Sequence, residues 1–257
     1  MESKGLDGLW FNSGNSKWRK LLFIIISVLP VSFLMKFVSE WTHEFLGHCG
    51  IGFLAGGQPI SYYVSWIWPL EFGYAFVSFP AGASDLSRAF MAGGGIIACL
   101  IAGISCHIII YYVVRKRAMK SNIVFIILHI LFWYGFWAFM NSTGYLLVGS
   151  LFNFGDIRLL TIYTNISNWV FLIPGFLALI FFYYLISKNF NLLFKPFSSL
   201  KAKWKLFIFW LLLPVIFILV SLNPSIAISL NLFFIVFPLM LIPSIISLIF
   251  SNRVFPD

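Results

Sequence analysis

One segment of the sequence places three ionisable side chains inside a long apolar stretch. The string WTHEFLGH, residues 41–48, lies within an apolar run that extends from Leu21 to Gly56. Titratable groups are costly at membrane depth, so those found there tend to face inward and to serve a function. Hydrolytic zinc sites combine histidine ligands with a glutamate that activates water. The segment therefore predicts a metal site in which His43 and His48 are ligands and Glu44 is the general base.

The spacing of the two histidines differs from that of the common zinc-protease helix. That helix carries H-E-x-x-H, with its histidines four residues apart on one face, whereas His43 and His48 are five residues apart. At about 100° per residue, positions five apart point about 140° away from each other in a regular α-helix. One wide turn of π-helix absorbs an extra residue, and such turns tend to occur at functional sites. We therefore predict a π-bulge, eased by Gly47, since glycine tolerates unusual backbone conformations.

The six-residue motif HEFLGH itself resembles the H-E-L-L-G-H zinc motif of the dipeptidyl-peptidase III family. The resemblance implies two histidine ligands around a catalytic glutamate despite the inserted residue. It covers the motif alone, because that family is soluble and its second, glutamate-bearing motif has no match here. A different ligand pair is also open. Glu44 and His48 are four residues apart and could themselves bind the metal, with His43 orienting a ligand.

The composition assigns the chain to a membrane. Of its 257 residues, 61% are hydrophobic and only 10% are charged, and the mean hydropathy is +0.96. A soluble domain could not bury so much apolar surface, so we predict an all-α polytopic membrane protein. The formal net charge of +9 comes from basic residues in short segments between the apolar runs. We assign them to topology and lipid headgroups, which predicts the lipid bilayer as a partner and no nucleic acid.

The apolar runs predict six or seven transmembrane helices in a multi-pass protein of the cell membrane. A polar N-terminal segment, residues 1–19, precedes a retained signal anchor. The first run is either one helix kinked at Pro30 or two short helices that meet near Lys36–Glu40. With six spans the basic clusters share one side, which the positive-inside rule makes cytoplasmic. The other predicted spans are Ala89–Val114, Ile123–Phe152, Asn168–Ile186, Leu206–Leu222 and Ile226–Phe250.

The stretch between the first two runs has a different pattern. Gly56-Gly57-Gln58-Pro59 ends the helix, and two segments rich in β-branched and aromatic residues follow, at Ile60–Trp66 and Gly73–Phe79. They predict a small β-hairpin-like insertion after the zinc-motif helix. The edges of such a hairpin must be covered or wet. An interfacial aromatic loop would explain the same tryptophans and tyrosines equally well.

A zinc hydrolase needs a third protein ligand, and Asp156 is the best candidate by elimination. It is the only acidic residue between Asp85 and the last residue of the chain. Glu40, Glu71 and Asp85 belong to boundary or loop-like segments, which makes them weaker candidates. A helix cap or an ion pair with Arg158 would explain Asp156 as well as metal binding does.

Two asparagines and a glycine cluster accompany these candidate ligands. Asn141, Asn153 and Gly47 could orient a ligand or contact a substrate backbone, although asparagine in a membrane helix commonly serves only to join helices. The cluster Gly93-Gly94-Gly95 allows a neighbouring helix to approach closely. His107 and His129 are isolated histidines in apolar runs, which predicts packing with a local hydrogen bond.

The order of these features resembles the core of the site-2 proteases, which are intramembrane zinc metalloproteases, over residues 20–160. A zinc-motif helix is followed by a Gly-rich turn and short strands, then by a helix with a glycine cluster and a helix whose far end carries Asn and Gly-Asp. The resemblance implies a three-helix catalytic core with zinc held by His43, His48 and Asp156, and Glu44 as the general base. It also implies that the strands bind an unwound substrate helix by edge pairing.

The chain departs from that family in several respects. Its motif is one residue longer, and the usual Asn-x-x-Pro and Leu-Asp-Gly signature is reduced to Gly155-Asp156-Ile157. The topology derived from charge places the motif nearer the outer face than the family does. Residues 161–257 match no family feature and predict additional transmembrane helices of unknown role.

We therefore expect an intramembrane zinc metalloprotease that hydrolyses peptide bonds of membrane-spanning or membrane-proximal substrates. One alternative is a catalytically degenerate relative that acts as a scaffold or binder of transmembrane segments. Another is a metal or proton transporter in which the same four ionisable side chains line a path. A transporter needs polar residues at several depths, whereas this sequence concentrates them at two positions. The identity of the substrate, a membrane protein or peptide, does not follow from the sequence.

Overall fold

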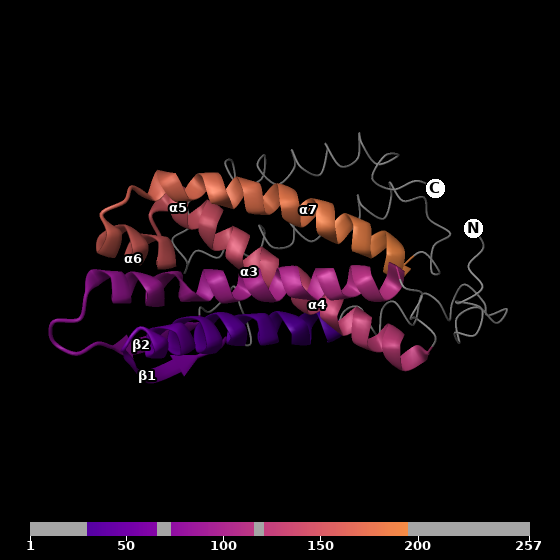
Figure 1. Ribbon diagram of the computed structural model, residues 1–257, viewed down its shortest axis with the longest axis horizontal. Helices are drawn as coiled ribbons and strands as arrows, with labels where there is room; N and C mark the ends of the chain where they lie inside the picture. Colours follow the sequence, from indigo (N-terminus) through magenta and orange to yellow (C-terminus); the bar gives the residue numbers. More distant parts are fainter. Residues whose placement is uncertain (1–29, 66–72, 116–120, 195–257) are drawn as a thin grey trace.

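The described part of the chain is mostly helical and carries one small two-stranded sheet (Figure 1). The computed structural model describes residues 30–65, 73–115 and 121–194. The predicted N-terminal segment 1–19, Glu71 and the expected spans Leu206–Leu222 and Ile226–Phe250 lie outside these residues. The predictions for those segments therefore stay predictions.

The helix that carries the HEFLGH motif (the motif helix) is continuous over residues 30–54 and changes its winding at the motif. Residues 30–41 are α-helical, η1 (Thr42–Ile51) is a π-helix, and α2 (Gly52–Leu54) returns to α-helical winding. The predicted wide turn is confirmed, and it extends over ten residues. The helix has no break across residues 36–40, so the alternative of two short helices meeting there is wrong.

Within the described residues, three helical runs are long and apolar enough to cross a membrane. They are Asp85–Val114, Ile123–Phe152 and Asn168–Phe190, and they correspond to three of the predicted spans. Their length and composition are consistent with a membrane protein. The first run lies in α3 (Asp85–Arg115), the second joins α4 (Asn122–Gly144), η2 (Tyr145–Gly149) and α5 (Ser150–Phe152), and the third joins η3 (Asn168–Phe171) and α7 (Leu172–Phe194).

The predicted hairpin is present directly after the motif helix. Strands β1 (Gln58–Tyr63) and β2 (Tyr74–Ser78) pair antiparallel, with an irregularity in register between Pro59 and Ser61. The hairpin packs against η1, where the ring centroids of Phe45 and Tyr62 lie 5.0 Å apart. It therefore lies beside the motif helix, at the end of the helical bundle that also holds α6 (Gly155–Thr164) (Figure 1).

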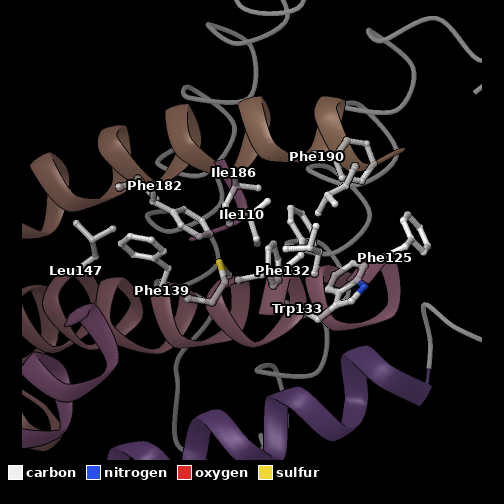
Figure 2. Packing of buried hydrophobic residues seen from close by; sticks show 14 residues of the cluster. Ile110, Phe125, Phe132, Trp133, Phe139, Leu147, Phe182, Ile186 and Phe190 are labelled. Atoms are coloured by element: carbon white, nitrogen blue, oxygen red, sulfur yellow. The ribbon is translucent and has the colours of Figure 1, made fainter. Parts of the chain in front are cut away.

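A hydrophobic core joins α3, α4 and α7 (Figure 2). Phe139 and Phe182 are fully buried, and their ring centroids lie 4.9 Å apart. His107 on α3 is buried in this region and accepts a hydrogen bond on its backbone oxygen from Asn189 Nδ2 at 2.8 Å. The prediction of a packed histidine with a local hydrogen bond is confirmed for His107. The contact also fixes α7 to the same core that supports the motif helix.

The glycine cluster lets α3 approach the motif helix backbone to backbone. A Cβ atom at Gly47 would lie 2.7 Å from the backbone nitrogen of Gly95, and a Cβ atom at Gly94 would lie 2.5 Å from Gly47 O. Real Cβ atoms do not approach other atoms so closely. The close approach predicted from Gly93-Gly94-Gly95 is therefore confirmed. In η1 its partner is Gly47, a residue that the sequence had linked to the distorted turn and to a possible role beside the ligands.

Replacing Gly47 by alanine is expected to destabilise the protein by about 1–3 kcal/mol, because neither backbone can retreat without moving a helix. The matched control is Gly144→Ala on α4, where a Cβ atom meets nothing within 4 Å. That substitution is expected to stabilise the fold by about 0.5–1 kcal/mol, since alanine favours a helix over glycine. Unfolding of the two purified variants in detergent compares them. Equal stabilities would show that the two helices are not in contact at Gly47.

Candidate metal centre

Two histidines from the motif helix and one aspartate from a distant segment meet inside the protein. Nε2 of His43 lies 3.0 Å from Asp156 Oδ2, and Nε2 of His48 lies 3.3 Å from Asp156 Oδ1. The two Nε2 atoms are 3.2 Å apart. One potential ligand atom from each residue falls within 4.8 Å of the others, and all three residues are buried. This group could hold a metal ion.

The π-helical winding of η1 brings His43 and His48 together. Hydrogen bonds in a π-helix join residue i to residue i+5, so residues five apart lie one turn above each other. His43 and His48 have this spacing, and both lie inside η1. The wide turn inferred from the motif thus has the predicted consequence, because the two imidazoles meet with an interplanar angle of 83° and ring centroids 4.8 Å apart.

Asp156 reaches the histidines from the first turn of α6. The chain turns sharply before it, with left-handed backbone conformations at Asn153 (φ 50°) and Gly155 (φ 58°). The resemblance implied an aspartate on the third helix, but the structure places it on the next, short helix after this turn. Arg158 is exposed, and within the described part of the chain Asp156 pairs with the two histidines. Asn153 is exposed at the turn and is not one of the three clustered residues.

A hydrogen bond made by Nδ1 of His48 determines the tautomer of its ring. It leaves Nε2, the nitrogen nearer Asp156, without a hydrogen in the neutral form. Nδ1 of His48 lies 2.8 Å from the backbone oxygen of Met91. A carbonyl oxygen only accepts, so Nδ1 must carry the hydrogen and donate it. In the neutral ring Nε2 then has a lone pair, which points toward the Asp156 carboxylate. Two acceptors at this distance repel each other unless a cation, either a proton or a metal ion, lies between them.

Glu44 lies beside the cluster on the same π-helix and is buried, with 3% of its surface exposed. Gly73, the residue directly before β2, covers it closely, because a Cβ atom there would lie 3.0 Å from Glu44 Oε1. The carboxylates of Glu44 and Asp156 are near enough to interact electrostatically with each other and with both histidines. Glu44 is outside the group of three ligand atoms that lie within 4.8 Å of one another. The geometry therefore favours His43 over Glu44 as the partner of His48.

Asn141 contacts a buried carboxylate one turn before the motif. Its Nδ2 donates to Glu40 Oε1 at 3.0 Å, and Lys36 Nζ lies 4.0 Å from the same oxygen. This contact joins α4 to the motif helix, which is the interhelical role weighed for Asn141 from the sequence. Asp85, another acid considered as a ligand, lies at the exposed start of α3.

Two residues that surround His43 were not predicted from the sequence to belong to the site. Tyr145 stacks on its imidazole with ring centroids 4.6 Å apart and an interplanar angle of 14°. Gly95 approaches the same ring, since a Cβ atom there would lie 2.5 Å from both Cε1 and Nε2 of His43. The glycine cluster could have indicated Gly95. Tyr145 is one of ten tyrosines in an aromatic-rich chain, so no sequence signal distinguishes it.

Comparisons with known proteins return no match: no protein-family model fits the chain, and neither a curated protein nor a solved structure matches it. Any functional conclusion must therefore come from the geometry of the site and from the chemistry of its residues.

Proposed function

We propose that the protein is a membrane-embedded zinc metallopeptidase, with His43, His48 and Asp156 as the zinc ligands and Glu44 as the general base. One observation supports this most strongly. Three buried ligand atoms from two distant segments converge within 4.8 Å of one another. The converging groups are two imidazoles and one carboxylate, which is a ligand set typical of catalytic zinc sites with a position left for water.

The donor set favours a metal ion over a purely structural ion pair. Burying a carboxylate and two histidines together is costly unless their lone pairs are satisfied. The Met91 carbonyl holds Nδ1 of His48 as a donor, so its Nε2 is available as a ligand in the neutral ring. Orientation of a ligand histidine by a backbone carbonyl is the common arrangement at metal sites. Two imidazoles and one carboxylate, with a further position left for water, form a ligand set found at catalytic zinc sites.

Glu44 is placed to move the protons of a hydrolysis. When bound, a zinc ion supplies a Lewis acid that makes water nucleophilic near neutral pH and polarises a carbonyl group. Glu44 accepts a proton from the water that attacks the scissile carbonyl carbon. It then donates this proton to the leaving amine nitrogen as the carbon–nitrogen bond breaks. Burial beside Gly73 keeps its carboxylate in one position and excludes bulk water.

The hairpin next to Glu44 offers a binding surface for an extended substrate. Among the described residues β1 and β2 pair only with each other, so each strand has one edge without a neighbouring strand. An extended peptide can pair with such an edge through backbone hydrogen bonds. Large side chains also project from the strands, at Ile60, Tyr62, Tyr74 and Phe76, and are between 45% and 65% exposed. We propose that the substrate is an unwound segment of a membrane protein or a membrane-associated peptide, in the cell membrane.

Removal of the metal tests this proposal directly. Purified protein in detergent or vesicles is expected to cleave a model transmembrane substrate, because the three ligands hold zinc beside Glu44. Treatment with a chelator is expected to abolish cleavage, and added zinc is expected to restore it. Cleavage that persists after the protein has been shown to contain no zinc would contradict a metallopeptidase. A protein that binds zinc but cleaves nothing would favour the non-catalytic scaffold.

A further inference from the structure

The three candidate ligands are oriented in different ways. His48 is held by a hydrogen bond from Nδ1 to the Met91 carbonyl, as metal-binding histidines commonly are. His43 has no carbonyl of this kind, and its buried Nδ1 meets no strict hydrogen-bond geometry among the described residues. The Cys99 thiol lies beside this ring and interacts with it, while the thiol also donates to the backbone oxygen of Ser39 at 3.6 Å. A thiol is a weak hydrogen-bonding group, so packing against the ring is expected to contribute to its rotation.

Close packing on both faces of the ring can fix this rotation. A Cβ atom at Gly95 would lie 2.5 to 2.7 Å from Cε1, Nε2 and Nδ1 of His43. Distances so nearly equal place that atom above the face of the imidazole, so the Gly95 backbone covers one face. Tyr145 is stacked almost parallel to the ring with centroids 4.6 Å apart, and it must cover the other face, because the two groups cannot occupy the same space.

Tyr145 also contacts the segment that supplies the third ligand. A Cβ atom at Gly155 would lie 2.9 Å from Cε1 of Tyr145. Gly155 has a φ of 58° and directly precedes Asp156. The tyrosine ring therefore lies against His43 and against the turn that delivers Asp156. Its position in η2, a second π-helical segment at the end of α4, places the ring between them.

We infer that Tyr145 is a positioning residue of the metal centre: its ring, opposite Gly95, forms a slot that fixes the rotation of His43 and its distance from the Asp156 turn. This inference rests on the proposed function, since it assumes that the site binds a metal ion. The flat face of the ring is the part that acts. Phenylalanine at this position is therefore expected to keep the positioning role of the tyrosine, whereas aliphatic side chains are expected to lose it.

Cobalt(II) is the probe for this inference, because its visible absorption reports ligand geometry independently of activity. Tyr145→Leu and Tyr145→Met each remove the flat face of the ring, and methionine still fills the space with a flexible chain. Two variants are used so that, if one fails to fold, the other still tests the inference. Both are expected to shift the cobalt spectrum and to weaken zinc binding about 10- to 100-fold, as happens when the group that orients a ligand is lost. Tyr145→Phe is expected to restore both properties to the wild-type values.

Phe182→Leu is the matched control, since it removes a buried ring from the core of α4 and α7 without touching His43. It is expected to lower stability and to keep the cobalt spectrum and the zinc affinity. A normal spectrum in the folded Leu and Met variants would overturn the inference. A Phe variant as impaired as Leu would also overturn it, by assigning the effect to the hydroxyl group. Wild-type protein that binds neither ion would instead refute the proposed metal site.

Discussion

Glu44→Gln is expected to lose peptide cleavage while the protein keeps its zinc. The substitution preserves the shape of the side chain but removes the group that accepts a proton from water. Loss of a general base slows a reaction by about 10²–10⁴-fold. Because Glu44 lies outside the three clustered ligand atoms, the ligand set is untouched. Parallel measurement of the cleavage rate and of the zinc content per chain gives both halves of the result.

The same variant separates the two ligand assignments that the sequence left open. If Glu44 and His48 were the ligands, Glu44→Gln would lose zinc together with activity. Glu40→Gln is the matched control, because Glu40 is also buried on the motif helix and its amide oxygen can still accept from Asn141. It is expected to retain zinc and most of the cleavage. A Glu44→Gln protein that cleaves at the wild-type rate would rule out Glu44 as the base.

The wide turn in the motif helix was predictable because a metal site needs both histidines at one place, whereas a regular α-helix would hold them apart. Two histidines five residues apart cannot share an ion in a regular α-helix, so the sequence required a wide turn. The structure contains that turn, but as ten residues of π-helix rather than a single bulge. The extent of the π-helix follows no local signal. Inside it, Gly47 packs against Gly94 and Gly95, which is a contact between segments far apart in the sequence.

The rest of the site depends on contacts that a single sequence does not reveal. Elimination among eight acidic residues was enough to select Asp156, yet its position on α6 was not foreseen. The pattern Asn153-Phe154-Gly155 offered a signal for the sharp turn, since asparagine and glycine tolerate left-handed conformations. Tyr145 offered none. Stacking on His43 requires that α4 and the motif helix be placed side by side, and aromatic residues are 20% of this chain.

Asp156→Ala and His48→Ala are each expected to lose bound zinc, which wild-type protein is expected to hold at about one ion per chain. Each substitution removes one of three buried ligands, and two remaining groups cannot close the coordination shell. The expected loss of zinc affinity is larger for these variants than for replacement of a residue that only orients a ligand, which weakens binding about 10- to 100-fold. Zinc content after purification, together with competition against a chromophoric chelator, measures the effect.

Arg158→Ala is the control that distinguishes two roles of Asp156, as a metal ligand or as the ion-pair partner of Arg158. Arg158 lies two residues further along α6 and is exposed. If Asp156 served only to pair with Arg158, both variants would lose stability and neither would change the zinc content. If Asp156 is the third ligand, Arg158→Ala keeps zinc and Asp156→Ala does not. Zinc retained in Asp156→Ala but lost in His48→Ala would place the third ligand elsewhere, and Glu40, buried one turn before His43, would be the next residue to replace.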